Sequence, residues 1–268
     1  MKKIFILSVC MGFIMFQSCK KDTIEGCTDP KASNYNPNAT ESDGNCVFDK
    51  TDDIAELAIR QVKNGQETQF LSARTSFIEL LTQESYVYND REYSSFYHFN
   101  PAQDTSRKVY IGMTQYEDMS TFQEVSNKLG GTTEATAFFE TFDILTFTAL
   151  KPLVPGTPVD LSKLATGNQI LEIAVRDLSL YPNFNMADYE SKRDAFLTKL
   201  AAQPATVKEY QWVSVLNPNL VVGMTVYQDQ NSFFQLSSNP TFMNDPTVQA
   251  FFGTYPPNMG GEVSTIVK

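Results

Sequence analysis

The sequence is poor in the residues from which most metal and redox sites are built. It has one histidine, four cysteines and one tryptophan in 268 residues. It contains no Cys-x-x-Cys pair and no HExxH, Walker, GxGxxG or GxSxG motif. These absences exclude the common zinc-dependent, nucleotide-dependent and serine-hydrolase chemistries. We therefore expect no metal centre and no cofactor, and the sequence alone does not indicate a reaction.

Basic residues are also scarce. Lysine and arginine total 21 against 31 acids, which gives a net charge of −10. An acidic chain repels phosphate backbones, so we do not expect nucleic acid as a partner. Hydrophobic residues make up 42% of the chain and include 20 phenylalanines. This supply is enough for the core of one large domain or two small ones.

The N-terminus has the pattern of an export signal. Residues 1–3 are Met-Lys-Lys, and an apolar run follows at 4–16, too short to span roughly 30 Å of hydrocarbon. The following Phe-Gln-Ser-Cys, ending at Cys19, resembles the relaxed lipobox of Bacteroidota lipoproteins. The resemblance implies cleavage after residue 18, lipidation of Cys19, a tether at 19–25, and a lipid anchor in the cell envelope, at the outer membrane. An ordinary secretory signal or a buried helix is the alternative.

A short Asn/Asp-rich segment follows the tether. Residues 26–46 have the form GCTD…NYNP…DGNC, which resembles a small module of secreted Bacteroidota proteins. Outside the signal and the lipid cysteine only Cys27 and Cys46 remain, so in an oxidising compartment we expect them to form a disulfide. Asp29 and Asp43 offer oxygen ligands suited to calcium. The same residues also suit plain turns.

From about residue 54 the chain repeats itself. Short segments recur in the same order with offsets of 111 to 119 residues, which indicates a tandem duplication. The matching segments are 56–60 with 172–176, 74–77 with 193–196, 92–93 with 209–210, 100–101 with 217–218, 112–116 with 223–227, and 138–142 with 251–255.

Each copy predicts the order β-α-β-β-α-β, a ferredoxin-like repeat. The first repeat spans 54–151, a linker spans 152–168, and the second repeat spans 169–268. Two such units in one chain resemble the dimeric α/β-barrel superfamily, which includes antibiotic-biosynthesis-monooxygenase-like proteins. The resemblance implies an α+β fold in which both repeats form one intrachain barrel. Two separate ferredoxin-like domains are the alternative.

Alternation along the first strand of each repeat suggests which residues face inward. We expect Leu57 and Ile59, with Ile173 and Val175 in the second copy, to lie under helices. The intervening residues would then point into the barrel: Glu56, Ala58 and Arg60, with Glu172, Ala174 and Arg176. The charges could instead pair across strands or lie at the barrel rim.

The repeated charges lead to a hypothesis of ligand binding. We expect a pocket for a small organic, anionic ligand, because the planar guanidinium of arginine binds carboxylates in a bidentate manner. The candidate residues are Arg60, Arg176, Glu56, Glu172, His98, Tyr116, Tyr227 and Trp212. His98 has Val215 at its matching position, and Trp212 matches Ser95, so a packing role is open for both.

Two other functions remain open. Some members of the superfamily oxidise aromatic compounds without a cofactor, and the chain could be an enzyme of that kind. Others act on haem, which a helix histidine holds, and the predicted helices here contain none. The third possibility is a structural lipoprotein that binds another protein of the envelope through an apolar outer surface.

Overall fold

The computed structural model describes residues 23–99 and 104–268. The chain divides into two compact units, Met1–Asp49 and Lys50–Lys268. The predicted signal peptide and Cys19 lie outside the described residues. Within the described part of the chain, no helix has both the length and the apolar character needed to cross a membrane.

The smaller unit is organised by its disulfide. Strands β1 (Glu25–Gly26) and β2 (Glu41–Ser42) pair in parallel, and Cys27 is bonded to Cys46 as predicted. Asp29 and Asp43 each accept a hydrogen bond from a backbone N–H two residues further on, both at 2.9 Å. The two aspartates thus stabilise turns. Among the described residues, no group of three histidines, cysteines or acids could hold a metal ion.

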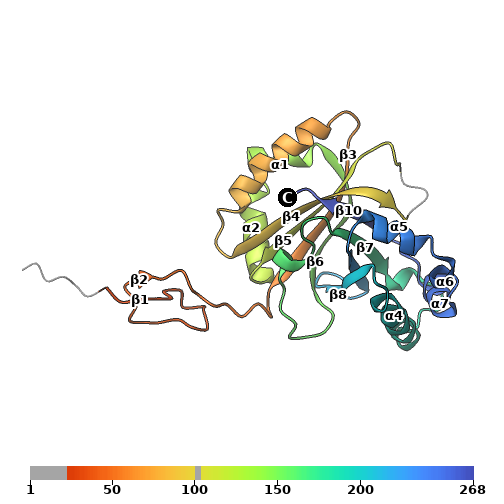
Figure 1. The fold of residues 1–268 in the computed structure, drawn as a ribbon. Helices are drawn as coiled ribbons and strands as arrows, with labels where there is room; N and C mark the ends of the chain where they lie inside the picture. The colour runs from red at the N-terminus through yellow and green to blue at the C-terminus, as the bar shows by residue number, and fades with distance from the viewer. Residues whose placement is uncertain (1–22, 100–103) are drawn as a thin grey trace, which may run out of the picture. The chain divides into compact units, whose positions relative to one another are not determined.

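The larger unit contains a closed eight-stranded barrel with antiparallel neighbours (Figure 1). The strand order around the barrel is β10-β4-β5-β3-β6-β8-β9-β7. The strands are β3 (Ile54–Val62), β4 (Val87–His98), β5 (Val109–Tyr116), β6 (Phe142–Pro152), β7 (Ile170–Asp177), β8 (Thr206–Ser214), β9 (Leu220–Tyr227) and β10 (Gly260–Ile266).

The barrel consists of two halves with the same topology. The first half has the order β4-β5-β3-β6 and the second has β8-β9-β7-β10, each that of a ferredoxin-like repeat. Strand β6 pairs with β8, and β10 pairs with β4, so each half closes the other. The predicted fold class is confirmed, and the alternative of two separate domains is excluded.

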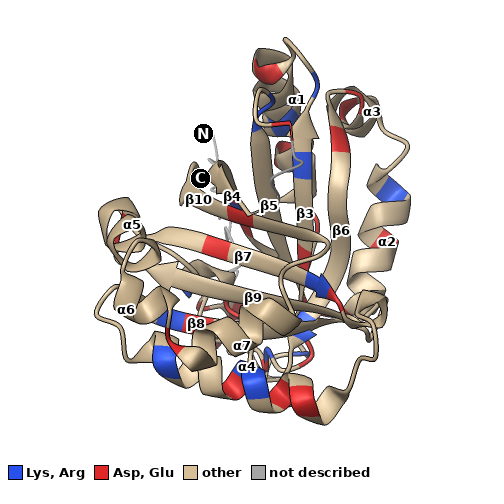
Figure 2. Cartoon of the chain, turned by 90° about the vertical axis from the view of Figure 1, so that its right-hand side faces the viewer, with Lys and Arg blue, Asp and Glu red and all other residues tan. Residues whose placement is uncertain are grey.

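Helices cover the outside of the barrel, α1 to α3 over the first half and α4 to α7 over the second (Figures 1 and 2). Several begin at a side-chain cap; Asp118, Asn185 and Asp229, for example, accept hydrogen bonds from the first turn of their helices. The helices are α1 (Glu67–Leu81), α2 (Met119–Leu129), α3 (Thr133–Phe139), α4 (Met186–Ala201), α5 (Gln230–Ser237), α6 (Pro240–Met243) and α7 (Pro246–Thr254), with 3₁₀ turns η1 (Leu161–Lys163) and η2 (Leu178–Leu180).

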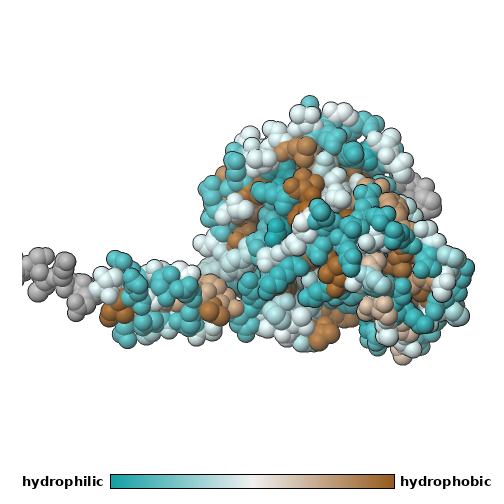
Figure 3. Space-filling model, in the orientation of Figure 1, coloured by the Kyte–Doolittle hydropathy of each residue, from teal (hydrophilic) through white to brown (hydrophobic). Residues whose placement is uncertain are grey.

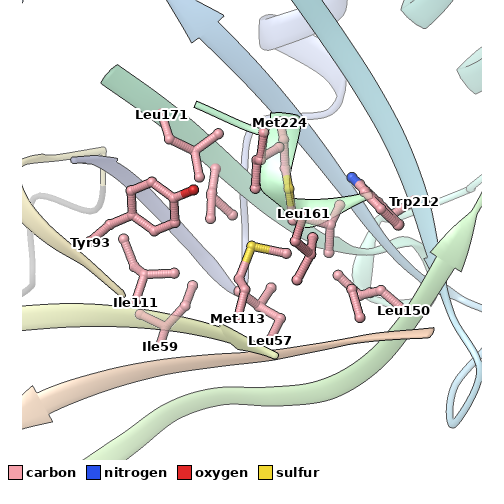
Figure 4. Close-up of a cluster of buried hydrophobic side chains, with 14 of the residues drawn as sticks. Leu57, Ile59, Tyr93, Ile111, Met113, Leu150, Leu161, Leu171, Trp212 and Met224 are labelled. Carbon is pink, nitrogen blue, oxygen red and sulfur yellow. The ribbon is translucent and has the colours of Figure 1, made fainter. Parts of the chain in front are cut away.

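The interior of the barrel is an apolar core shared by both halves. Leu57, Ile59, Ile173 and Val175 belong to this core, together with Met113 and other apolar residues (Figure 4). Our prediction that these four residues lie under helices was therefore wrong. The opposite faces of the strands, which carry Glu56, Ala58 and Arg60 or their counterparts, face the helices. Bulky side chains fill the barrel, whereas the helices supply their own aromatic residues to the outer layer.

The linker between the repeats is part of this core. Val159, Leu161, Leu164 and Ala165 are at most 2% exposed and pack with the barrel residues. Gln115 on β5 holds the segment: its amide donates to the carbonyl of Val159 at 2.9 Å and accepts from the N–H of Leu161 at 3.1 Å. The linker thus contributes apolar side chains to the core.

Candidate functional site

A cavity of about 520 Å³ lies between the sheet of the first half and helices α1 to α3. Its floor comes from the outer faces of β3, β4 and β5, where the small residues Ala58 and Gly112 leave space. Its walls are mainly apolar. Helix α1 contributes Phe77, Ile78 and Leu81, α2 contributes Val125 and Leu129, α3 contributes Phe138 and Phe139, and β6 contributes Phe142, Ile144 and Phe147.

The floor of the cavity carries a buried ionic network. Arg60 Nη2 donates to both carboxylate oxygens of Glu92, at 2.8 and 2.7 Å. Arg74, from α1, donates through Nε to Glu92 at 2.6 Å and through Nη2 to Asp90 at 2.7 Å. All four side chains are at most 6% exposed. The two arginines and the two acids neutralise one another, which offsets the cost of burying them.

A glycine makes room for this network. Gly112 lies opposite Glu92 in the sheet, and a Cβ at this position would clash with Arg60 Nη2 and lie 3.0 Å from Arg60 Cζ. The guanidinium also lies over the rings of Phe70 and Phe138, at 5.4 and 5.3 Å from their centres. Arg60 is therefore held by Glu92 on one side and by aromatic rings on the other.

Glu56 is a fifth charged residue of the lining and stands apart from the network. It accepts a hydrogen bond of 2.9 Å from the hydroxyl of Tyr116. Burial raises the pKa of Glu56, although Tyr116 and Arg60 partly oppose the rise. Burial and the neighbouring Glu56 carboxylate raise the pKa of Tyr116. The cavity therefore contains a carboxyl group that retains its proton to a higher pH than an exposed glutamate does.

The rim of the cavity is hydrophobic. Phe139, Ile144 and Phe147 line the cavity and are 48%, 51% and 50% exposed. On the face of the barrel unit drawn in Figure 3, brown hydrophobic residues lie among teal hydrophilic ones. A ligand that fills the cavity would cover part of this rim, so its apolar portion would be in contact with these three side chains.

The second half places related residues at the equivalent position but bonds them differently. Tyr227 donates to Glu172 at 2.7 Å, as Tyr116 does to Glu56. Arg176, however, donates to the carbonyl of Tyr255 at 2.8 Å and lies over the ring of Phe251 at 4.9 Å. Burial lowers the pKa of Arg176 and raises that of Glu172. Charged residues lie on the barrel strands as well as on the outer faces of the helices (Figure 2).

The sheet register corrects one part of the repeat alignment. Gln211 lies opposite Gly223, as Glu92 lies opposite Gly112, so Gln211 and not Glu209 is the counterpart of Glu92. The second half therefore has a neutral amide where the first has the central carboxylate. By the same register, Trp212 corresponds to Tyr93 and not to Ser95.

The structure thus separates the residues that we expected in one pocket. Glu56, Arg60 and Tyr116 line the cavity. Their counterparts Glu172, Arg176 and Tyr227 lie on β7 and β9 of the second half and do not line this cavity. Trp212 is in the core of the barrel.

His98 lies at the β4–β10 seam, where its Nδ1 pairs with Glu262. Glu262 is fully buried and also accepts a hydrogen bond of 2.6 Å from Ser95. Ser95 Oγ also lies 3.4 Å from Nδ1 of His98, so the serine and the carboxylate meet the same ring nitrogen. In a nucleophilic triad the histidine binds the serine and the carboxylate through different nitrogens, so this arrangement is not a triad.

Sequence reasoning missed three members of the network: Arg74, Asp90 and Glu92. Arg74 and Glu92 were noticed only as markers of the repeat. A signal was present, because Arg74 lies on the buried face of α1 in register with Phe70 and Ile78, and a charge at such a position requires a partner. Strand β4 also has a bulge between Tyr88 and Arg91, next to Asp90, which sequence patterns do not reveal.

No protein-family model and no curated protein matches this sequence. Several solved structures are similar. An anthrone oxidase-like protein has a TM-score of 0.53 at 10% identity, over 81% of this chain and 92% of its own. A protein described as a chlorite dismutase has a TM-score of 0.51 at 8% identity, over 81% of this chain and 95% of its own. These similarities establish the dimeric α/β-barrel fold.

Haem, which some proteins of this fold bind, does not fit the residues of the cavity. Its described lining contains no histidine, cysteine or methionine. The one tyrosine among these residues, Tyr116, is hydrogen-bonded to Glu56, and the single histidine of the chain is at the β4–β10 seam, paired with Glu262. The cavity therefore offers no available axial ligand for a haem iron.

Proposed function

We propose that the protein binds a small organic ligand in the cavity of its first half. The observation that carries this proposal is a cavity of about 520 Å³ with apolar walls and a polar, internally hydrogen-bonded floor. Protein interiors are usually close-packed, and ligand sites combine an apolar lining with a few polar groups that orient the ligand.

We further propose that the ligand is bound outside the cytoplasm by a lipid-anchored protein. Support comes from the N-terminal pattern that ends at Cys19 and from the Cys27–Cys46 disulfide, since disulfides persist mainly in oxidising compartments. A carrier or receptor in the cell envelope is consistent with both features. The outer membrane is the location we favour.

A second candidate function is an enzyme that acts without a cofactor. The specific observation in its favour is Glu56, a carboxyl group with a raised pKa that is hydrogen-bonded to Tyr116 inside an apolar cavity. Such a group is suited to proton transfer to or from a bound substrate. Turnover of a bound compound, lost in Glu56→Gln with binding retained, would distinguish the enzyme from a carrier.

The test of ligand binding is to fill the cavity and compare the variant with a matched control. Ala58 lines the cavity, and its counterpart Ala174 in the second half is equally buried, at 7% exposure. We expect a metabolite library to contain compounds that raise the melting temperature of the wild type and of Ala174→Leu but not of Ala58→Leu. Equal binding to the three proteins, or no binding to the wild type, would contradict the proposal.

A further inference from the structure

The charges that line the cavity are unequal. Three acids, Glu56, Asp90 and Glu92, face two arginines, Arg60 and Arg74. Both arginines are already bonded to Glu92, and Arg74 also to Asp90. An anionic ligand would place a further negative charge beside Glu92 and Asp90, which already balance the two guanidinium groups. The charge that remains for a ligand is the carboxyl group of Glu56.

The surroundings of Glu56 also favour a cation. Its carboxyl group accepts one hydrogen bond from Tyr116, whereas a carboxylate can accept several. Phenylalanine rings dominate the walls, from Phe77 on α1 to Phe147 on β6. The faces of aromatic rings attract cations, and the attraction increases when the cation is removed from water.

We propose that the cavity selects an organic cation: an apolar amine whose ammonium group binds Glu56 and whose body packs against the phenylalanines of the walls. This inference rests on the proposed function and specifies its ligand class. It replaces the anionic ligand that the sequence suggested, because Arg60 is paired with Glu92 and Arg176 donates to the carbonyl of Tyr255 in the second half.

Proton uptake and amine binding should compete at Glu56. The charged or titratable groups that face its carboxyl group are Tyr116 from β5, Arg60 from the same strand and Asp90 from β4. Burial raises the pKa of Glu56, so its carboxyl group holds a proton to a higher pH than an exposed glutamate does. Affinity for an ammonium ligand should therefore increase as the pH rises through this pKa.

The test uses three probes that differ in charge and share one apolar body: 1-naphthylmethylammonium, 1-naphthylmethanol and 1-naphthylacetate. Binding to the purified mature protein is measured by calorimetry at neutral pH. We expect the ammonium probe to bind at least about tenfold more tightly than the alcohol, which corresponds to about 1.4 kcal/mol, and the carboxylate to bind most weakly.

Two variants locate the effect. Glu56→Gln should abolish the preference for the ammonium probe. Glu172→Gln makes the same change in the second half, where the glutamate also accepts a hydrogen bond from a tyrosine, and should leave the preference unchanged. Equal effects of both substitutions would place the binding elsewhere and overturn the inference.

The outcomes separate the inference from the function on which it rests. If none of the probes binds and the metabolite screen is also negative, the binding function itself fails. If the alcohol or the carboxylate binds as tightly as the ammonium probe, and Ala58→Leu still abolishes binding, the cavity is a ligand site but the charge preference is refuted. The order of the three affinities for the wild type tests the charge preference even if Glu56→Gln does not fold.

Discussion

Gly112 and Gly223 occupy matching positions in β5 and β9, but their surroundings differ. A Cβ at Gly112 would clash with the buried guanidinium of Arg60, whereas a Cβ at Gly223 would lie 3.2 Å from the amide nitrogen of Gln211. We therefore expect Gly112→Ala to lower the free energy of unfolding by about 1–3 kcal/mol, because it forces Arg60 away from Glu92.

Gly223→Ala is the matched control for this substitution. The side-chain amide of Gln211 can shift by a few tenths of an ångström to accept the methyl group. Alanine is also favoured over glycine in a strand by roughly 0.5–1 kcal/mol. We expect a change close to zero. Urea unfolding of both variants measures the difference, and equal destabilisation would show that the ionic network does not constrain Gly112.

Glu209 should make the stability of the barrel depend on pH. Burial, reinforced by the nearby Glu172, raises the pKa of Glu209 from 4.5 to about 8. The folded protein then holds a proton that the unfolded chain releases between these two values. The free energy of unfolding should therefore fall as the pH rises through this window.

Glu209→Gln should make this fall smaller, because the amide does not titrate. The measurement is urea unfolding at several pH values between 5 and 9. Glu190→Gln, which changes an exposed glutamate on α4, serves as the control and should retain the wild-type slope. A slope that is unchanged in Glu209→Gln would assign the pH dependence to other groups.

At the scale of strands and helices, periodicity predicts most of the architecture. The predicted order is found in both repeats: it begins with β3, α1, β4 and β5 in the first and with β7, α4, β8 and β9 in the second. The facing of the strands was predicted incorrectly. Alternation places Leu57 and Ile59 on one side and Ala58 and Arg60 on the other. Both sides of β3 are covered, however, so burial alone does not indicate which side is the interior.

The same limit applies to the candidate site. Glu56, Arg60 and Tyr116 could be selected from sequence because they recur in the second repeat. The first half has its ionic network because it carries Glu92 where the second half carries Gln211. These two residues are recognised as counterparts only from the strand register. Register is set by the hydrogen-bond ladder and its bulges, which short sequence matches do not determine.

The small disulfide-bonded unit should depend on its cross-link, and the barrel should not. Cys27 and Cys46 are 19 residues apart, and a loop of this size gains about 3 kcal/mol from closure. We expect Cys27→Ser/Cys46→Ser to make residues 26–46 sensitive to protease while the melting temperature of the barrel stays the same. A lower melting temperature of the barrel would show that the two units stabilise each other.

At the scale of the whole molecule, the prediction concerns where the protein is held. If Cys19 carries the lipid, Cys19→Ser should leave the protein without an anchor. We expect it to move from the membrane fraction to the soluble fraction of the cell, because acyl chains contribute roughly 0.8 kcal/mol per buried methylene. An unchanged melting temperature of the barrel in Cys19→Ser, compared with the wild type, shows that the variant is folded. Retention in the membrane after the substitution would refute lipid anchoring.

The closure of the barrel has a consequence for the order of events during synthesis. Strand β10 is the last barrel strand in the chain, and it pairs with β4 on one side and β7 on the other. Until it is made, β4 and β7 each have an open edge, and open edges recruit other strands. These two edges are therefore the last to be paired when the chain is synthesised from its N-terminus. If the protein is exported as we propose, chaperones that shield open strand edges should raise the yield of the folded barrel.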